Sequence, residues 1–204
     1  MGTALPPSAS CSSVGSAMSR VIHVFRTPER FVAGTVGEPG DRTFYLQAID
    51  EDKVVSVMLE KEQVAVLAER LSALLNEVVR RLGAEVFAEA DELVDTEPLR
   101  TPVEQEFRVG TMGLGWDIES RAIVVELLAV SEQEVDESMV LDDTEEGPDA
   151  VRVFLSLQQA RAFAVRAERV IAAGRKPCPL CAEPLGTHGH ICPRQNGYRR
   201  QVEA

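Results

Sequence analysis

Three cysteines and two histidines lie within fifteen residues near the end of the chain, in the segment CPLCAEPLGTHGHIC. Cys178 and Cys181 are separated by two residues, as in a metal-binding knuckle, and Cys192 follows after ten more. Soft thiolates with one imidazole form the tetrahedral ligand set that suits zinc. So short a segment cannot bury a core of its own, and a bound ion is the simplest way to order it. The spacing therefore predicts a Zn²⁺ site.

The fourth ligand is either His190 or His188. His190 lies two residues before Cys192 and pairs with it as Cys178 pairs with Cys181, so we favour His190, with His188 as the alternative. A site closed by four protein ligands keeps no open position for water. We therefore expect a structural zinc rather than a catalytic one.

A CxxC pair can also be a redox dithiol or a pair of inert thiols. The redox motif is typical at the head of a helix that follows a strand. Here Cys178 follows a predicted helix and precedes a loop rich in proline and glycine. This context favours zinc over both alternatives.

Charge is unevenly distributed along the chain. The formal net charge is -12, and residues 18–174 hold sixteen basic and thirty-one acidic side chains. So acidic a body repels phosphate backbones and anionic membrane surfaces. From residue 175 onward five basic residues face two acidic ones. The candidate contacts to a protein partner, or less favourably to nucleic acid, are Arg194, Tyr198, Arg199 and Arg200.

The segments that must position this tail repeat a pattern. The spacing of Phe31, Gly34, Thr35 and Gly37 returns in residues 107–113. In each half three strand-like segments precede an amphipathic helix, and the second helix opens on a Ser-x-x-Gln capping box. Expected strands are 31–37, 42–49 and 54–59 in the first half, and 107–113, 122–130 and 150–155 in the second, with helices from 60 and 157.

This pattern predicts an α+β fold of two repeated strand–strand–strand–helix units with a mostly antiparallel sheet. A short zinc knuckle follows the second unit. The predicted boundaries are a disordered extension 1–17, a first repeat 18–83, a linker 84–104, a second repeat 105–174 with an acidic insertion 131–149, and the knuckle and basic tail 175–204.

Two glycine-rich stretches invite a phosphate-binding interpretation. GTMGLGWD (residues 110–117) lacks the lysine of a P-loop and does not open a helix. In its counterpart GTVGEPGD, Pro39 and Gly40 predict a type II turn. We interpret the glycines of both stretches as turn and bulge residues.

Catalytic motifs are missing from the sequence. It contains no Gly-x-Ser-x-Gly elbow and no His-Glu-x-x-His, and His23 in an early strand is better explained as a hydrogen-bonded sheet residue. Without a secretory signal or an apolar run of membrane-spanning length, we expect a cytoplasmic protein.

The segments FVAGTVGEPGDRTFYLQA, LEKEQVAVLAERL and CPLC…GHICPRQNGYRR resemble an uncharacterised family of conserved actinobacterial proteins, a domain of unknown function. The resemblance spans residues 18–200. It implies His190 as a ligand and, from gene neighbours in the family, a kinase-like or histidine-phosphatase-like partner. The family has no assigned activity, so the resemblance implies little else about function.

We therefore expect an interaction or adaptor protein without enzymatic activity, whose zinc-binding tail docks a protein partner. The alternative is an enzyme or small-ligand-binding protein with a pocket between the two repeats, since ligand sites often lie at such interfaces.

Overall fold

The computed structural model describes residues 20–82, 95–131, 144, 147–174, 178–181, 192 and 194. Seven strands and two helices lie within these ranges, in the order β1 (Ile22–Phe25), β2 (Arg30–Val36), β3 (Thr43–Asp50), β4 (Lys53–Leu59), α1 (Lys61–Leu82), β5 (Gln105–Asp117), β6 (Ala122–Ala129), β7 (Ala150–Leu155) and α2 (Leu157–Ala172). Four strands thus precede α1, and three strands precede α2.

All seven strands form one mixed sheet, in the order β1-β7-β6-β5-β4-β3-β2. β2, β3 and β4 are antiparallel neighbours, and so are β5, β6 and β7. The pairings of β4 with β5 and of β1 with β7 are parallel. The predicted α+β class with a mostly antiparallel sheet is confirmed.

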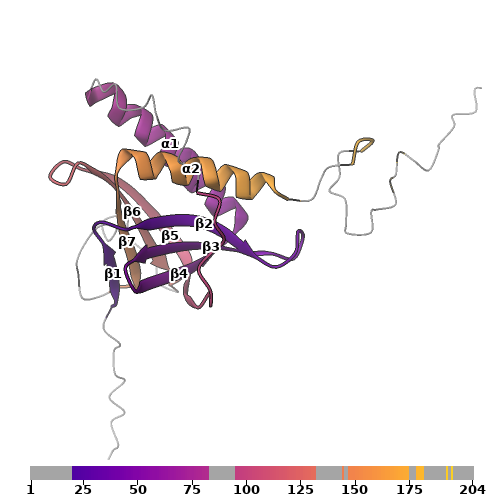
Figure 1. The fold of residues 1–204 in the computed structure, drawn as a ribbon, viewed down its shortest axis with the longest axis horizontal. Helices are drawn as coiled ribbons and strands as arrows, with labels where there is room; N and C mark the ends of the chain where they lie inside the picture. Colours follow the sequence, from indigo (N-terminus) through magenta and orange to yellow (C-terminus); the bar gives the residue numbers. More distant parts are fainter. Residues whose placement is uncertain are drawn as a thin grey trace, which may run out of the picture.

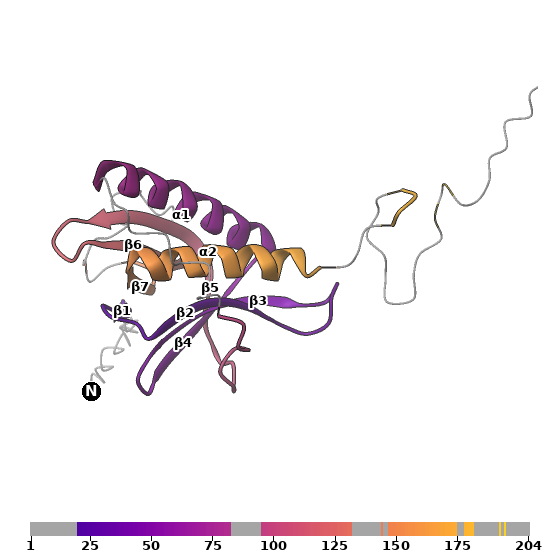
Figure 2. The same cartoon turned by 45° about the horizontal axis from the view of Figure 1, so that its top comes forward.

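Both helices cover the same face of the sheet and lie side by side (Figures 1 and 2). In α1 the predicted apolar stripe is buried at Val64, Leu67, Leu71 and Val78, while Leu74 packs against the core from a half-buried position. α2 begins with the predicted capping box, in which Ser156 and Gln159 bond each other's backbone N–H. No helix in the described part of the chain has the length and apolarity to cross a membrane.

The turn between β2 and β3 has the predicted chemistry. The backbone N–H of Asp41 donates to the carbonyl of Glu38 at 2.9 Å, which closes a four-residue turn around Pro39 and Gly40. Gly40 has a φ of 107°, in the region that glycine occupies readily.

The second glycine-rich stretch is not a turn, and this part of the prediction was wrong. Residues 110–117 lie inside β5, where Gly113 pairs with Glu126 and Gly115 with Val124. The register shifts only around Gly110, which is therefore the one predicted bulge residue confirmed in this stretch. β6 supplies pairing partners from Thr111 to Asp117, so the chain turns only after Asp117.

The connector between the halves docks on the face of the sheet that the helices leave free. Buried Gln47 of β3 accepts a hydrogen bond from the N–H of Arg100 at 2.7 Å and donates to the Arg100 carbonyl at 3.0 Å. Leu99 lies directly over Gly34, which has no side chain to prevent this approach. Residues 95–104 form neither helix nor strand.

Three regions with predicted properties fall largely or wholly outside the described residues: the extension 1–17, most of the acidic insertion 131–149 and most of the tail 175–204. Their predicted order or disorder stays untested. Residues 131–149 lie between β6 and β7 in the chain.

Candidate metal centre

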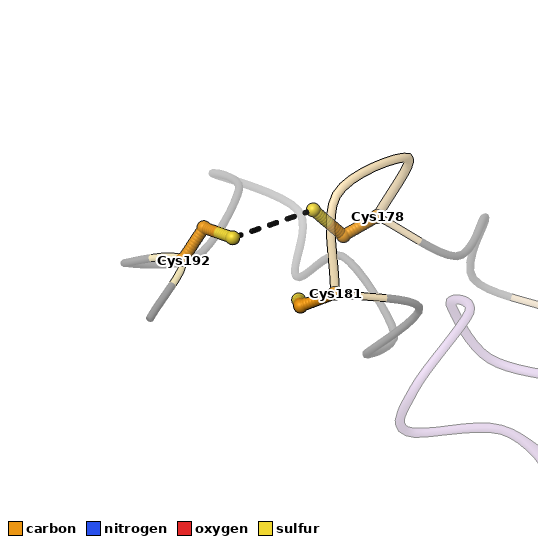
Figure 3. A group of neighbouring side chains, drawn as sticks. All are labelled: Cys178, Cys181 and Cys192. Carbon is orange, nitrogen blue, oxygen red and sulfur yellow. Dashed lines mark hydrogen bonds between the residues drawn. The ribbon is translucent and has the colours of Figure 1, made fainter. Parts of the chain in front are cut away.

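Three thiols converge in the tail. The Sγ atoms of Cys178, Cys181 and Cys192 all lie within 4.8 Å of one another. The closest pair is Cys178 and Cys192, with their sulfur atoms 3.9 Å apart and turned toward each other (Figure 3). These are the three cysteines that the sequence spacing singled out.

The Cys178–Cys181 turn prepares one of these sulfurs to carry negative charge. Backbone N–H groups of Cys181 and Leu180 hydrogen-bond to the Cys178 sulfur and hold the pKa of that thiol below its ordinary value. Such bonds favour the thiolate, which is the form that binds a metal.

The predicted metal ligands and the residues between them differ in their exposure to solvent. Cys178 and Cys192 are buried, whereas Pro179 and Leu180 between the first two cysteines are exposed. Arg194 donates from Nη1 to the Leu180 carbonyl at 2.9 Å and so ties the segment after Cys192 to the tip of the turn. The tip therefore presents an apolar side chain beside a guanidinium.

The donor set fits a soft metal ion. Three cysteine sulfurs at these separations can occupy three corners of a tetrahedron around zinc. His190 and His188 both lie outside the described residues, so the fourth ligand stays a prediction. The same holds for three of the predicted contact residues, Tyr198, Arg199 and Arg200.

His23 behaves as expected of a sheet residue. It lies in β1, and its Nε2 is 3.1 Å from Oε1 of Glu106. In the described part of the chain, the cysteine group is the one cluster of three or more His, Cys, Asp or Glu side chains with metal-binding geometry.

Sequence reasoning missed a second polar cluster, in which two arginines share one aspartate. Arg30 of β2 bonds both carboxylate oxygens of Asp95, and Arg166 of α2 donates to Asp95 Oδ1 at 2.9 Å. One signal was available: Arg166 follows Phe163 by three residues on the apolar stripe of α2, where a charged side chain needs partners. Arg30 and Asp95 gave no comparable signal.

The Asp95 cluster lies beside a cleft. β2 and α2 line it through Arg30, Phe31, Phe163 and Arg166, and its volume is about 280 Å³. One wall thus comes from each half of the chain.

Comparison with protein families gives one match. A family model described as a protein of unknown function (DUF3090) matches residues 23–192, which include both halves and all three clustered cysteines. Comparison with curated proteins and with solved structures gives no match. The resemblance stated from the sequence is confirmed.

Proposed function

The chain belongs to the DUF3090 family of proteins of unknown function, and on that premise we propose that it is an interaction protein without enzymatic activity. A duplicated α+β platform carries a tail that a structural zinc ion orders. The tail docks a protein partner. The cysteine cluster is the observation that carries this proposal.

The proposed ligands are Cys178, Cys181, His190 and Cys192, with His188 as the alternative to His190. Four protein ligands leave no open position for a substrate or for water, so the ion's role is to fix the shape of the tail. Binding energy of a structural zinc orders a segment that is too short to bury a core.

Docking is proposed at the tip of the knuckle. Leu180 is 49% exposed there although it lies between two inward-facing cysteines. An exposed leucine next to the Arg194 guanidinium offers a partner one apolar and one cationic contact. The acidic body argues against nucleic acid as the main partner. Contact to RNA or DNA through Arg194, Tyr198, Arg199 and Arg200 is therefore the weaker proposal. Gene neighbourhood in the family favours a kinase-like or histidine-phosphatase-like partner.

The proposal predicts one zinc ion per full-length chain purified without a histidine tag. Cys192→Ser should remove most of the metal, as elemental analysis can measure, because three ligands hold zinc far less tightly than four. Substitution of His190 should do the same, while substitution of His188 should leave the metal content unchanged. Wild-type protein without bound metal would contradict the proposal.

Leu180→Ser tests the docking surface on the metal-loaded chain. It should abolish capture of a specific partner from extracts of the source organism, as read by mass spectrometry, without changing the zinc content. Leu82→Ser is the matched control, since Leu82 is a comparably exposed leucine at the end of α1. Equal capture by both variants would exclude the knuckle tip as the docking surface.

A second candidate function is a small-ligand-binding protein with its pocket between the two repeats. The cleft between β2 and α2 favours this candidate because each half supplies one of its walls.

A further inference from the structure

The floor of the cleft between β2 and α2 is aromatic. The rings of Phe31 and Phe163 stack with their centroids 4.8 Å apart, and Val32 and Ala162 complete the apolar lining. The volume of about 280 Å³ lies just below the usual range for pockets that hold drug-sized ligands, about 300–1,000 Å³. A cavity of about 150 Å³ already accepts benzene. The cleft therefore has room for one ring and a small polar group.

Two side chains of α2 bond backbone carbonyls on either side of the cleft, one just before β2 and one within it. Gln159 Nε2 donates to the carbonyl of Pro28 at 2.7 Å, and Arg166 Nε donates to the carbonyl of Ala33 at 2.7 Å. Phe31 lies between them, two residues before Ala33 in the same strand, so its backbone N–H and C=O point out of the same edge. Neither group has a partner among the described residues.

The length of this open edge decides between two kinds of ligand. An added peptide strand needs several consecutive backbone groups to pair with. Gln159 and Arg166 already occupy the flanking carbonyls of Pro28 and Ala33, so the run of free backbone groups beside the cleft is interrupted on both sides of Phe31. A small molecule that needs one or two backbone contacts fits this edge better than a peptide strand does.

The charge on the cleft wall favours an anion. Arg30 and Arg166 share the single carboxylate of Asp95. Burial lowers the pKa of Arg166; the charges of Asp95 and, to a smaller extent, Glu97 oppose this shift, and the like charge of Arg30 adds to it. The other two nearby carboxylates, Glu29 and Glu97, are exposed, and water screens their fields.

Each guanidinium also keeps hydrogen-bonding capacity. A guanidinium has five N–H groups, and four hydrogen bonds from Arg30 and four from Arg166 reach Asp95, Ala33, Glu97 and Pro98. Among the described residues, one N–H of each is left without an acceptor. A carboxylate in the cleft would offer charged acceptors to these N–H groups.

We propose that this cleft binds a small carboxylic acid that carries one ring or a branched apolar group. The apolar group lies against Phe31 and Phe163, and the carboxylate accepts from Arg30, Arg166 and the backbone N–H of Phe31. This inference rests on the second candidate function and names its ligand class. It includes no chemical step.

Three probes of one shape test the inference on the wild-type full-length chain. Phenylacetate carries a carboxylate, phenylacetamide is its neutral analogue, and phenethylamine is a cation. In titrations followed by amide NMR, phenylacetate should shift the signals of residues 29–32 and 159–166 and bind at least tenfold more tightly than either analogue. Equal or tighter binding of the amide or of the amine would overturn the carboxylate assignment and leave a small-ligand cleft standing. No binding of any probe would overturn both the inference and the second candidate function.

Substitutions locate the binding in the cleft. Ala162→Leu fills it and should abolish phenylacetate binding, whereas Ala65→Leu, at an equally half-buried alanine of α1, should leave the affinity unchanged. Arg30→Met keeps the apolar stem and should reduce phenylacetate affinity about tenfold without weakening phenylacetamide. Unchanged phenylacetate affinity in Ala162→Leu, with the fold verified by its NMR spectrum, would place the binding elsewhere and overturn the inference.

Discussion

Asp95 connects three parts of the chain that are far apart in sequence. Its carboxylate accepts from Arg30 in the first half and from Arg166 in the second, and it also accepts the backbone N–H of Glu97 at 2.8 Å. The hydrogen bond from Arg30 is the main cause that holds the pKa of Asp95 below its ordinary value, with the Glu97 N–H and the charge of Arg166 acting in the same direction. Burial opposes the shift.

Asp95→Asn should lower the free energy of unfolding at pH 7 by about 1–3 kcal/mol, because the bonds lost are charge-assisted. A carboxyl whose pKa is depressed in the folded state stabilises the protein above its unfolded pKa, about 3.9 for aspartate. That contribution is lost as the pH falls through the lower folded value. In denaturant titrations the difference between wild type and variant should therefore begin to shrink below about pH 3.9 and disappear below the folded pKa of Asp95. The control is Asp52→Asn, in the exposed β3–β4 turn, which should leave the free energy of unfolding unchanged. A difference between wild type and Asp95→Asn that stays constant at all pH values would contradict the stabilising role of the Asp95 carboxylate.

The two residue clusters differ in how well the sequence predicted them. Cys178, Cys181 and Cys192 lie within one short segment, so their spacing alone limits the geometry they can adopt. Arg30, Asp95 and Arg166 meet only because the fold brings a strand, a connector and a helix together. Spacing along the chain contains no information about such a meeting.

At the scale of elements, the connector can pack against β2 only because Gly34 has no side chain. A Cβ atom at Gly34 would lie 2.5 Å from Leu99 Cγ, well inside contact distance. Leu99 is buried against the outer face of β2, so it has little room to withdraw.

Gly34→Ala should therefore destabilise the protein by about 1–3 kcal/mol, the usual cost of overpacking. Chemical denaturation can measure this loss. Gly174→Ala is the matched control, since its Cβ would meet its neighbours at 3.6 Å or more, and its effect should stay within about 0.5 kcal/mol. The double variant Gly34→Ala/Leu99→Ala should lose less free energy of unfolding than the sum of the losses in the two single variants. If the losses are strictly additive, the clash between the new Cβ and Leu99 is not the cause of the destabilisation.

Element types were predictable where patterns are local. β7 spans the predicted residues 150–155, and the Ser156 cap fixes the start of α2. The parallel pairing of β1 with β7 joins residues 22 and 150, and no periodicity specifies a partner at that distance. The glycines of β5 misled because glycine is typical of turns, while the pairing with β6 determined the conformation.

At the scale of the whole molecule, the main core and the cysteine cluster are separate. The largest apolar cluster runs from Phe25 to Ala167, receives partly buried neighbours up to Ile171, and includes none of the three cysteines. Its stability should therefore not depend on a metal in the tail.

Removal of the metal with a chelator should leave the main unfolding transition within about 0.5 kcal/mol of its value in the loaded protein. Hydrogen exchange should accelerate around Cys178–Cys181 and stay unchanged in β3 and β6. Circular dichroism melts with and without chelator give the first measurement, and exchange followed by mass spectrometry gives the second. A large fall in the main transition would show that the tail is part of the cooperative core.

The pairing of β1 with β7 has a consequence for the order of events on the ribosome. Ile22 of β1 cannot pair until Ala150 of β7 has been synthesised, 128 residues later in the chain. At 5–20 residues per second, that delay is on the order of ten seconds. β2, β3 and β4 pair with near neighbours in sequence and need no such delay. During this delay of about ten seconds, Phe25, which is fully buried in the complete fold, has no strand to pair with. The nascent chain therefore leaves β1, with the side chain of Phe25, unpaired until nearly the whole sheet has been synthesised.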